Sequence, residues 1–309
     1  MELSLLLGKN IVSLLLILLA GVALVRLRVL QGDQAVVLNK VLLYAVTPCS
    51  VISAYQMECT PDRLLSLGAA LGGALCFALC FLLLARLLRR PLKLDAVEEG
   101  SLVYTNCGNL ILPLAGALLG QEGIFYASGY LVVQTLLIWT HGRKLLSGEP
   151  EIQWRSALLN VNILSVALGL LLFLLRIRLP DVIGSAVSGL GSMLGPMSML
   201  LLGMMLANTG LREIFARPRA WLIVLLRLIL PPLVVLLPLG LSGLTGLIPG
   251  GYTVLLVPML QAAAPCASMV SQFAQLYDKR PDWAGSINVL STILCVITLP
   301  LMAALYALL

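Results

Sequence analysis

The sequence predicts an all-α polytopic membrane protein with ten transmembrane helices, arranged as two inverted five-helix repeats. Hydrophobic residues make up 60% of the 309-residue chain and charged residues only 11%, whereas a soluble protein carries about 25% charged residues. The mean hydropathy is +1.02, and several apolar runs exceed the roughly 20 residues that cross a bilayer. Basic residues fall mostly in short loops, in the alternation expected of a multi-pass protein.

The apolar runs divide into ten predicted spans with short connections, which leave no room for a separate soluble domain. The approximate limits are 3–25, 34–56, 64–86, 96–119, 122–141, 156–176, 181–207, 219–241, 250–276 and 283–308. The first run has no basic amino-terminal region and is longer than the roughly 7–15 residues of a signal-peptide core. We therefore interpret it as a span.

The loop charges predict that both termini lie outside a plasma or inner membrane. Fourteen basic residues lie in the loops of one side and four in those of the other, and the richer side is expected to face the cytoplasm. The fourteen are Arg26, Arg28, Arg86, Arg89, Arg90, Lys93, Arg143, Lys144, Arg155, Arg212, Arg217, Arg219, Lys279 and Arg280.

Two further basic residues, Lys40 and Arg227, fall inside predicted spans. Either could be a counter-charge for a substrate. We favour the alternative, in which long side chains extend to the inner membrane interface.

Two sets of five spans must run in opposite directions, which gives an inverted repeat if the halves are related. The second span contains Pro48 and the seventh contains Pro196. The most polar and most interrupted spans are the fourth of each set, spans four and nine. Matched interruptions of this kind indicate the substrate site of a transporter.

In span four, whose central stretch is residues 101–120, the interruption is expected near Asn106, Asn109 and Pro113. Pro113 cannot donate a backbone hydrogen bond, and its ring crowds the carbonyl of Asn109. A broken helix is tolerated at membrane depth only inside protein or beside a water-filled cavity. We therefore predict that this span forms half of a substrate site.

Span nine contains Pro258 and Pro265, which are predicted to break it, and several polar residues. The candidate substrate-binding residues of the two spans are Asn106, Asn109, Pro113, Gln261, Pro265 and Ser268.

The acidic residues indicate the charge of the substrate. All fourteen lie in loops or near span ends, with Glu98 and Glu99 near the inner end of span four. A site without a fixed negative charge suits an anion. Half-helices that begin after each interruption would present free N–H groups to it, so we predict a monocarboxylate or dicarboxylate substrate.

The sequence does not predict an enzyme, a cofactor or a metal site. The seven cysteines include no CxxC pair, and the one histidine, His141, lies at the inner end of span five, where we interpret it as an interfacial residue. Intramembrane proteases need an aspartate pair, a serine–histidine pair or a metal, and the acidic residues here are peripheral.

At these residues the chain resembles the auxin efflux carrier family. The fourth-span pattern Asn106-x-x-Asn109-x-x-x-Pro113-Leu114 is similar to the family's first crossover motif, and Gln261-Ala-Ala-Ala-Pro265 is similar to its second. Ser291-Thr292 and Thr298-Leu299-Pro300-Leu301 in span ten also fit. The similarity runs along almost the whole chain.

The resemblance implies a fold akin to the bile acid/sodium symporters. Residues 1–62 and 146–210 would form a scaffold, and residues 63–145 and 211–309 a transport domain, with crossovers at 106–113 and 258–265. It further implies elevator-type movement, a homodimer through the scaffold helices, and contact of Asn106 with the substrate carboxylate.

The predicted function is a secondary transporter of small organic anions, malonate-like or auxin-like. A channel or a substrate sensor on the same fold remains an alternative. A sodium-coupled symporter is another, because the symporter relatives bind sodium near their crossovers.

Overall fold

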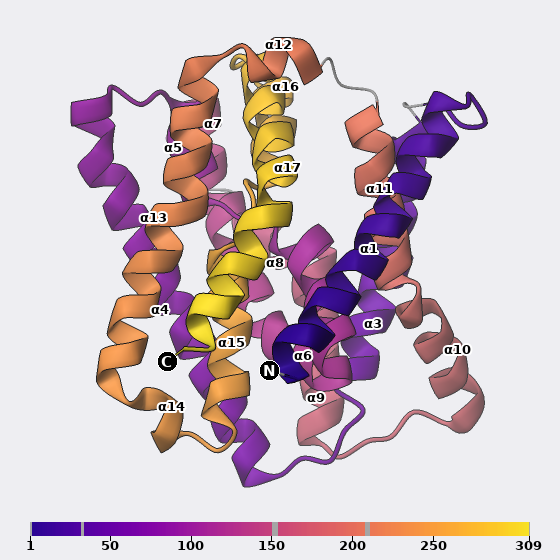
Figure 1. Cartoon of the computed structure of the whole chain (residues 1–309). Helices are drawn as coiled ribbons and strands as arrows, with labels where there is room; N and C mark the ends of the chain where they lie inside the picture. Colours follow the sequence, from indigo (N-terminus) through magenta and orange to yellow (C-terminus); the bar gives the residue numbers. More distant parts are fainter. Residues whose placement is uncertain (1, 32–33, 150–153, 208–210, 309) are drawn as a thin grey trace. The chain divides into compact units, whose positions relative to one another are not determined.

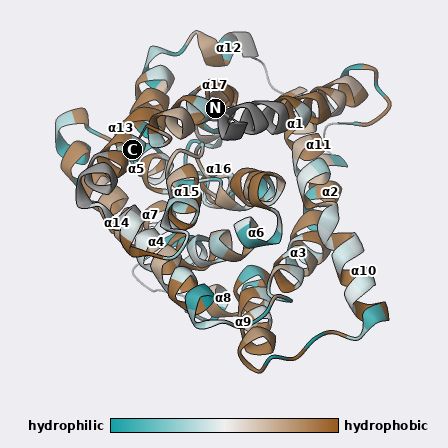
Figure 2. Ribbon diagram, turned by 60° about the horizontal axis from the view of Figure 1, so that its bottom comes forward, coloured by the Kyte–Doolittle hydropathy of each residue, from teal (hydrophilic) through white to brown (hydrophobic). Residues whose placement is uncertain are grey.

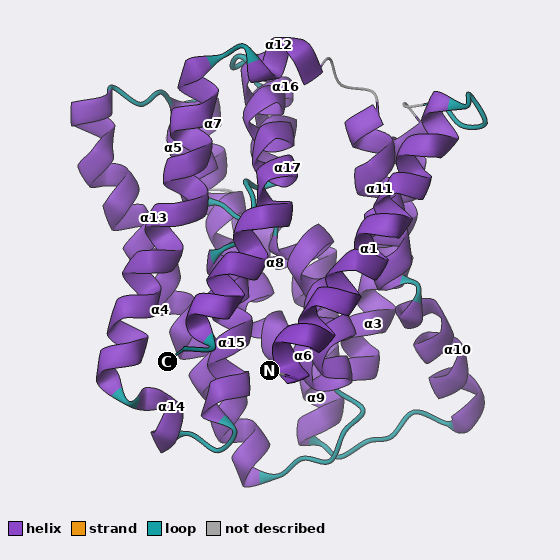
Figure 3. Ribbon diagram, viewed as in Figure 1, coloured by secondary structure: helices purple, strands orange, loops and turns teal. Residues whose placement is uncertain are grey.

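The computed structural model describes residues 2–31, 34–149, 154–207 and 211–308 of the chain (Figure 1). These residues are almost entirely helical, and the β-type pairing among them is an isolated bridge (Figure 3). Hydrophobic residues cover most of the helices (Figure 2). Six described helical segments are long and apolar enough to cross a membrane, and three shorter ones are also apolar. The predicted class, a polytopic helical membrane protein, is confirmed, whereas ten spans in two inverted sets stay a prediction.

Contacts between residues divide the chain into two compact units. The first comprises Met1–Leu64, Gly108–Ser128 and Leu159–Thr209. Its helices are α1 (Glu2–Arg26), α2 (Ala35–Val41), the π-helix η2 (Leu42–Val46), α3 (Thr47–Ala54), α9 (Val161–Leu174), α10 (Asp181–Ser192) and α11 (Leu194–Ala207), with most of the π-helix η3 (Cys107–Ile111) and the first part of α6 (Leu112–Leu137). The assignment of scaffold and transport helices stays a prediction.

Within the first unit, α1 and α11 pack through two glycines. A methyl group added at Gly21 would overlap the carbonyl of Leu200, and one added at Gly203 would overlap the carbonyl of Leu18. Small residues at such a crossing let helix backbones approach closely, as in many membrane helix pairs. Leu18 then packs in an apolar cluster with Met199 and Leu202 of α11.

An aromatic cluster packs α3, α6 and α9 together in the same unit. Tyr55, just after α3, packs edge-on against Phe125, with ring centroids 4.8 Å apart, and Phe125 lies 5.3 Å from Phe173. The Tyr55 hydroxyl shares a 2.7 Å hydrogen bond with Ser128 Oγ. Both partners are buried, so the bond satisfies two polar groups in an apolar setting.

A turn at Gly120 divides α6 into two helices. Gly120 has φ 62° and ψ −144°, a conformation open mainly to glycine. The turn falls between the predicted limits of spans four and five.

The second unit comprises Leu65–Cys107, Gly129–Leu158 and Gly210–Leu309. Its helices are α4 (Pro61–Leu92, from Leu65), α5 (Ala96–Val103), the last part of α6, the π-helix η4 (Ile138–Gly142), α7 (Arg143–Ser147), α8 (Trp154–Leu158), α12 (Leu211–Phe215), α13 (Pro218–Ser242), α14 (Leu244–Leu247), α15 (Gly251–Ala262), α16 (Ser268–Leu276) and α17 (Pro281–Tyr306).

The N-terminal end of α5 is fixed by a capping box and two ion pairs. The Asp95 side chain accepts a 2.8 Å hydrogen bond from the Glu98 N–H, and the Glu98 carboxylate accepts one from the Asp95 N–H. Arg219 of α13 binds both oxygens of Glu98, and Arg280, which precedes α17, pairs with Asp95. These contacts hold α5 against the ends of two other helices.

The glycine crossing of α1 and α11 gives a stability prediction. Gly203→Ala should destabilise the protein by about 1–3 kcal/mol, the usual cost of overpacking a tight contact. Gly195→Ala in the same helix is the matched control, because a methyl group there would meet nothing within 4 Å. The midpoint of thermal unfolding and the yield of monodisperse protein in size-exclusion chromatography are measured for both variants. Equal midpoints for the two variants would contradict the packing described.

Candidate functional site

In the second unit, the helical backbone is interrupted once within predicted span four and once within predicted span nine. Both interruptions are drawn as loops in Figure 3. The first runs from Tyr104 to Asn106, after α5, where Tyr104 has extended torsion angles of φ −96° and ψ 136°. The second runs from Ala263 to Ala267, between α15 and α16, and includes Pro265. Each interruption frees backbone groups that a continuous helix would have paired.

The two interruptions pair with each other as short antiparallel segments. The Asn106 N–H donates a 2.9 Å hydrogen bond to the carbonyl of Pro265, and the Ala267 N–H donates one of 2.9 Å to the carbonyl of Tyr104. Thr105 and Cys266 are the bridge pair between these bonds. The pairing satisfies backbone groups that water would otherwise have to reach.

Side chains of two further helices complete the backbone pairing. The Cys266 carbonyl accepts a 2.9 Å hydrogen bond from the Asn288 amide, and the Cys266 N–H donates a 3.1 Å bond to Ser291 Oγ. On the other segment, Gln134 donates a longer, 3.4 Å bond to the carbonyl of Thr105. The crossover is therefore built by α17 and α6 as well as by its own two segments.

The amide of Asn106 lies at the join of the two segments. The residue is 6% exposed, and its backbone is held by the carbonyl of Pro265. The side-chain amide carries two N–H donors and an acceptor oxygen. These groups are suited to bind a polar ligand at the join.

Two more predicted site residues flank the second interruption. Ser268 is half-buried and is the first residue of α16. The preceding Ala267 supplies no side-chain cap, although its carbonyl accepts a 3.1 Å hydrogen bond from the Val270 N–H. The N–H groups of Ser268 and Met269 are therefore not capped by a side chain of Ala267. Gln261, one residue before the end of α15, is fully buried.

The predicted residues Asn109 and Pro113 belong to the first unit. Asn109 lies half-buried in η3, and Pro113 is the buried second residue of α6. The interruption expected near Asn106, Asn109 and Pro113 includes Asn106 but not Pro113, because proline is tolerated in the first turn of a helix. The wider π-helix turn of η3 precedes it instead.

The prediction that Pro258 interrupts span nine is also wrong. Pro258 lies inside α15, which continues in helical form to Ala262. A transmembrane helix can keep its path through a proline when neighbouring groups compensate for the missing hydrogen bond. The interruption begins after Ala262.

Arg227 does not extend to the membrane interface, so that interpretation of the sequence is wrong. Its side chain is 0% exposed. It occupies the buried stripe of α13 with Ala220, Ile223, Val224 and Leu228, all of them 0% exposed. The guanidinium Nη1 donates a 3.0 Å hydrogen bond to the carbonyl of Ala262, the last residue of α15. Lys40, by contrast, is exposed.

Tyr104 links the crossover to His141. Its hydroxyl lies 2.7 Å from His141 Nδ1 and donates to the carbonyl of Leu137 at 3.2 Å. The same residue accepts the Ala267 N–H through its carbonyl. His141 is half-buried in η4. It contacts the crossover through the side chain of Tyr104.

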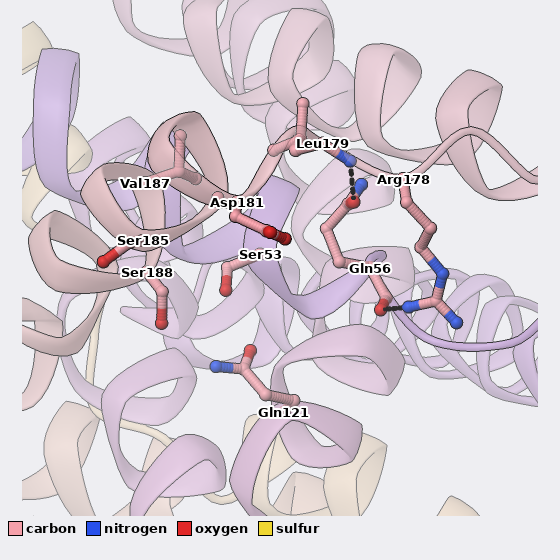
Figure 4. Close-up of a pocket in the computed structure, with 10 residues that line it drawn as sticks. Ser53, Gln56, Gln121, Arg178, Leu179, Asp181, Ser185, Val187 and Ser188 are labelled. Atoms are coloured by element: carbon pink, nitrogen blue, oxygen red, sulfur yellow. Dashed lines mark hydrogen bonds between the residues drawn. The ribbon is translucent and has the colours of Figure 1, made fainter.

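A polar cavity of about 630 Å³ lies in the first unit. Figure 4 shows polar side chains from α3, α6 and α10 around it, among them Ser53, Gln121 and Asp181. Gln56 fixes one wall, since its side chain accepts a 2.8 Å hydrogen bond from the Leu179 N–H and its carbonyl accepts one from Arg178. None of the predicted site residues lines this cavity.

Several residues that build the site were not predicted from the sequence as site residues. Asn288, Ser291 and Thr292 recur at helical spacing within an apolar span, and such a polar stripe faces protein rather than lipid. Arg227 follows the apolar residues Val224 and Ile223 by three and four positions, a spacing that places all three on one face of α13. Both signals could have been found. Nothing in the sequence indicated that Tyr104 would bind His141.

A family model described as "Membrane transport protein" matches the chain over residues 7–152 and 149–303. The two segments together span nearly the whole length, and the match confirms the family resemblance that the crossover motifs gave. A comparison with curated proteins finds no match.

The support from α17 gives a second prediction. Asn288→Ala should cost about 1–3 kcal/mol of stability, because it leaves the buried Cys266 carbonyl without its donor. Thr292→Val is the control, since its hydroxyl bonds only to the Asn288 carbonyl within the same helix. Hydrogen exchange of residues 263–268 and thermal unfolding would both report the difference. An Asn288 variant as stable as the Thr292 variant would contradict this role.

Proposed function

Because the chain belongs to the membrane transport protein family, we propose that it is a secondary carrier of small organic anions, either monocarboxylates or dicarboxylates. Family membership makes it a membrane transporter, whereas the anion, the site and the mechanism are our proposal. The observation that carries the proposal is the paired interruption of two helices, with the amide of Asn106 at the join.

The chemistry of the join favours an anion. The segments Tyr104–Asn106 and Ala263–Ala267 contain no acidic residue. The uncapped start of α16 carries a partial positive charge, and a helix N-terminus binds carboxylates through its N–H groups. The amide of Asn106 adds donors to one carboxylate oxygen. The apolar residues Met259 and Leu260 nearby in α15 suit an organic body.

The substrate site we propose lies within the second unit and comprises Asn106, Gln261, Pro265 and Ser268. The substrate-binding roles expected of Asn109 and Pro113, which belong to the first unit, stay predictions from the sequence. Asn106 and Ser268 would bind the carboxylate, and Pro265 would position Asn106 through the backbone bond. We further propose elevator-type alternating access and a homodimer, in keeping with the family resemblance. Membership of the membrane transport protein family supports transport rather than catalysis.

Counterflow in proteoliposomes tests the transport function. Vesicles loaded with unlabelled malonate or indole-3-acetate should accumulate the same labelled acid transiently, and uptake should saturate. A linear, non-saturating flux would indicate a channel instead. Replacing sodium with choline should leave the counterflow unchanged; a strict sodium requirement would favour the symporter alternative.

The role of Asn106 is tested by substitution. Asn106→Ala should weaken binding of the transported acid about tenfold or more, since hydrogen bonds to charged groups contribute about 1.5–3 kcal/mol. Asn162→Ala, in α9, is the control, because this half-buried asparagine lies outside the proposed site. Scintillation proximity measures the affinities and size exclusion the fold. Wild-type affinity in a well-folded Asn106 variant would remove this residue from the site.

A further inference from the structure

Two arginines of α13 differ in how their guanidinium groups are partnered. Arg219, the second residue of α13, donates from Nε and Nη2 to the two oxygens of Glu98, at 2.9 and 2.8 Å. This is the bidentate geometry in which the flat edge of a guanidinium fits a carboxylate. Arg227 lies two helical turns further into the span and has no such partner.

The contacts of Arg227 use only one of its three nitrogens. Nη1 donates to the Ala262 carbonyl at 3.0 Å, and the guanidinium carbon lies 5.1 Å from the centre of the Phe81 ring. Nε and Nη2 are shielded from solvent and make no hydrogen bond to any described residue. These are the same two nitrogens with which Arg219 holds Glu98.

Nothing among the described residues balances the charge of Arg227. Among the described residues, the four ion pairs join Glu122, Glu99, Glu98 and Asp95 to other arginines, and none of these pairs includes Arg227. A guanidinium stays charged in proteins, and an unpaired charge buried at membrane depth is costly. The C-terminal carbonyl of α15 and the Phe81 ring stabilise it only in part.

We propose that the Nε–Nη2 edge of Arg227 is the counter-charge that holds the substrate's carboxylate at the crossover. The guanidinium is held beside the end of α15 by the Ala262 carbonyl, and the second interruption begins at the next residue, Ala263. The proposal rests on the proposed carrier function and names its charged ligand group. It adds a fixed positive charge to the amide and the helix end of the proposed site.

The burial of the edge has a consequence for the bound state. Because Nε and Nη2 are closed to solvent, a carboxylate reaches them only when the surrounding side chains separate. The bound pair is then enclosed in a low-dielectric setting, where a charge pair is strong and a neutral ligand gains nothing from it. Arg227 should therefore set the preference for an acid over its neutral amide.

The test compares two ligands of nearly the same shape on four proteins. Scintillation proximity with labelled indole-3-acetate, displaced by indole-3-acetate or indole-3-acetamide, gives the acid-over-amide preference of each protein. Malonate and malonamide form a second probe pair. The proteins are the wild type, Arg227→Met, Arg227→Lys and the control Arg90→Met, which removes an exposed arginine of α4. Size exclusion and thermal unfolding check the fold.

Arg227→Met should lower the acid-over-amide preference about tenfold or more. Arg227→Lys should lower it less, because an ammonium keeps the charge but loses the bidentate fit. Arg90→Met should match the wild type. A general packing defect would weaken acid and amide alike and leave the preference unchanged, and that result in a folded Arg227→Met protein overturns the inference alone.

Two other outcomes are equally decisive. If Arg227→Met does not fold, Arg227→Lys carries the test, and an unchanged acid-over-amide preference in that variant overturns the inference. A wild type that binds neither acid overturns the proposed function, and the role of Arg227 falls with it.

Discussion

The structure depends on one constraint, which is that backbone groups freed inside a membrane protein must find partners within the protein. Two helices of the second unit stop at Val103 and at Ala262, and each end leaves carbonyl and N–H groups that the helix itself does not pair. The segments Tyr104–Asn106 and Ala263–Ala267 solve this together by bonding to each other. Asn288 and Ser291 then supply the groups that two short segments lack. The two interruptions are tolerated because both segments and the side chains of Asn288 and Ser291 meet in one place.

The same constraint governs charge. Near the N-terminal ends of α5, α13 and α17, Arg219 and Arg280 are paired with Glu98 and Asp95, and the arginine side chains are partly exposed. Deeper in the unit, Arg227 is fully buried and bonds to a carbonyl rather than to a carboxylate. Arg219 and Arg280 thus have carboxylate partners within the protein. For Arg227, the partner we propose is the carboxylate of the substrate. This difference distinguishes a structural arginine from a ligand-binding one.

The helical membrane class could be predicted from composition and apolar length, because both depend only on which residues occur and in what runs. The approximate position of the site could also be predicted, since Asn106 and Pro265 are unusual residues for a span. The exact interruptions could not. Whether Pro258 or Pro113 breaks a helix depends on which neighbours compensate for the lost hydrogen bond, and those neighbours are distant in sequence. For Arg227, the apolar residues at helical spacing indicated a buried position, but its hydrogen bond to the Ala262 carbonyl depends on packing between elements distant in sequence.

Hydrogen–deuterium exchange with and without a saturating carboxylate tests the central claim most directly. If the paired interruptions hold the anion, bound indole-3-acetate or malonate should slow exchange in peptides covering 104–107 and 263–268. Exchange in α9, which belongs to the first unit, should stay the same. Protection confined to the polar cavity beside Gln56 and Asp181, with both interruptions unaffected, would contradict the account.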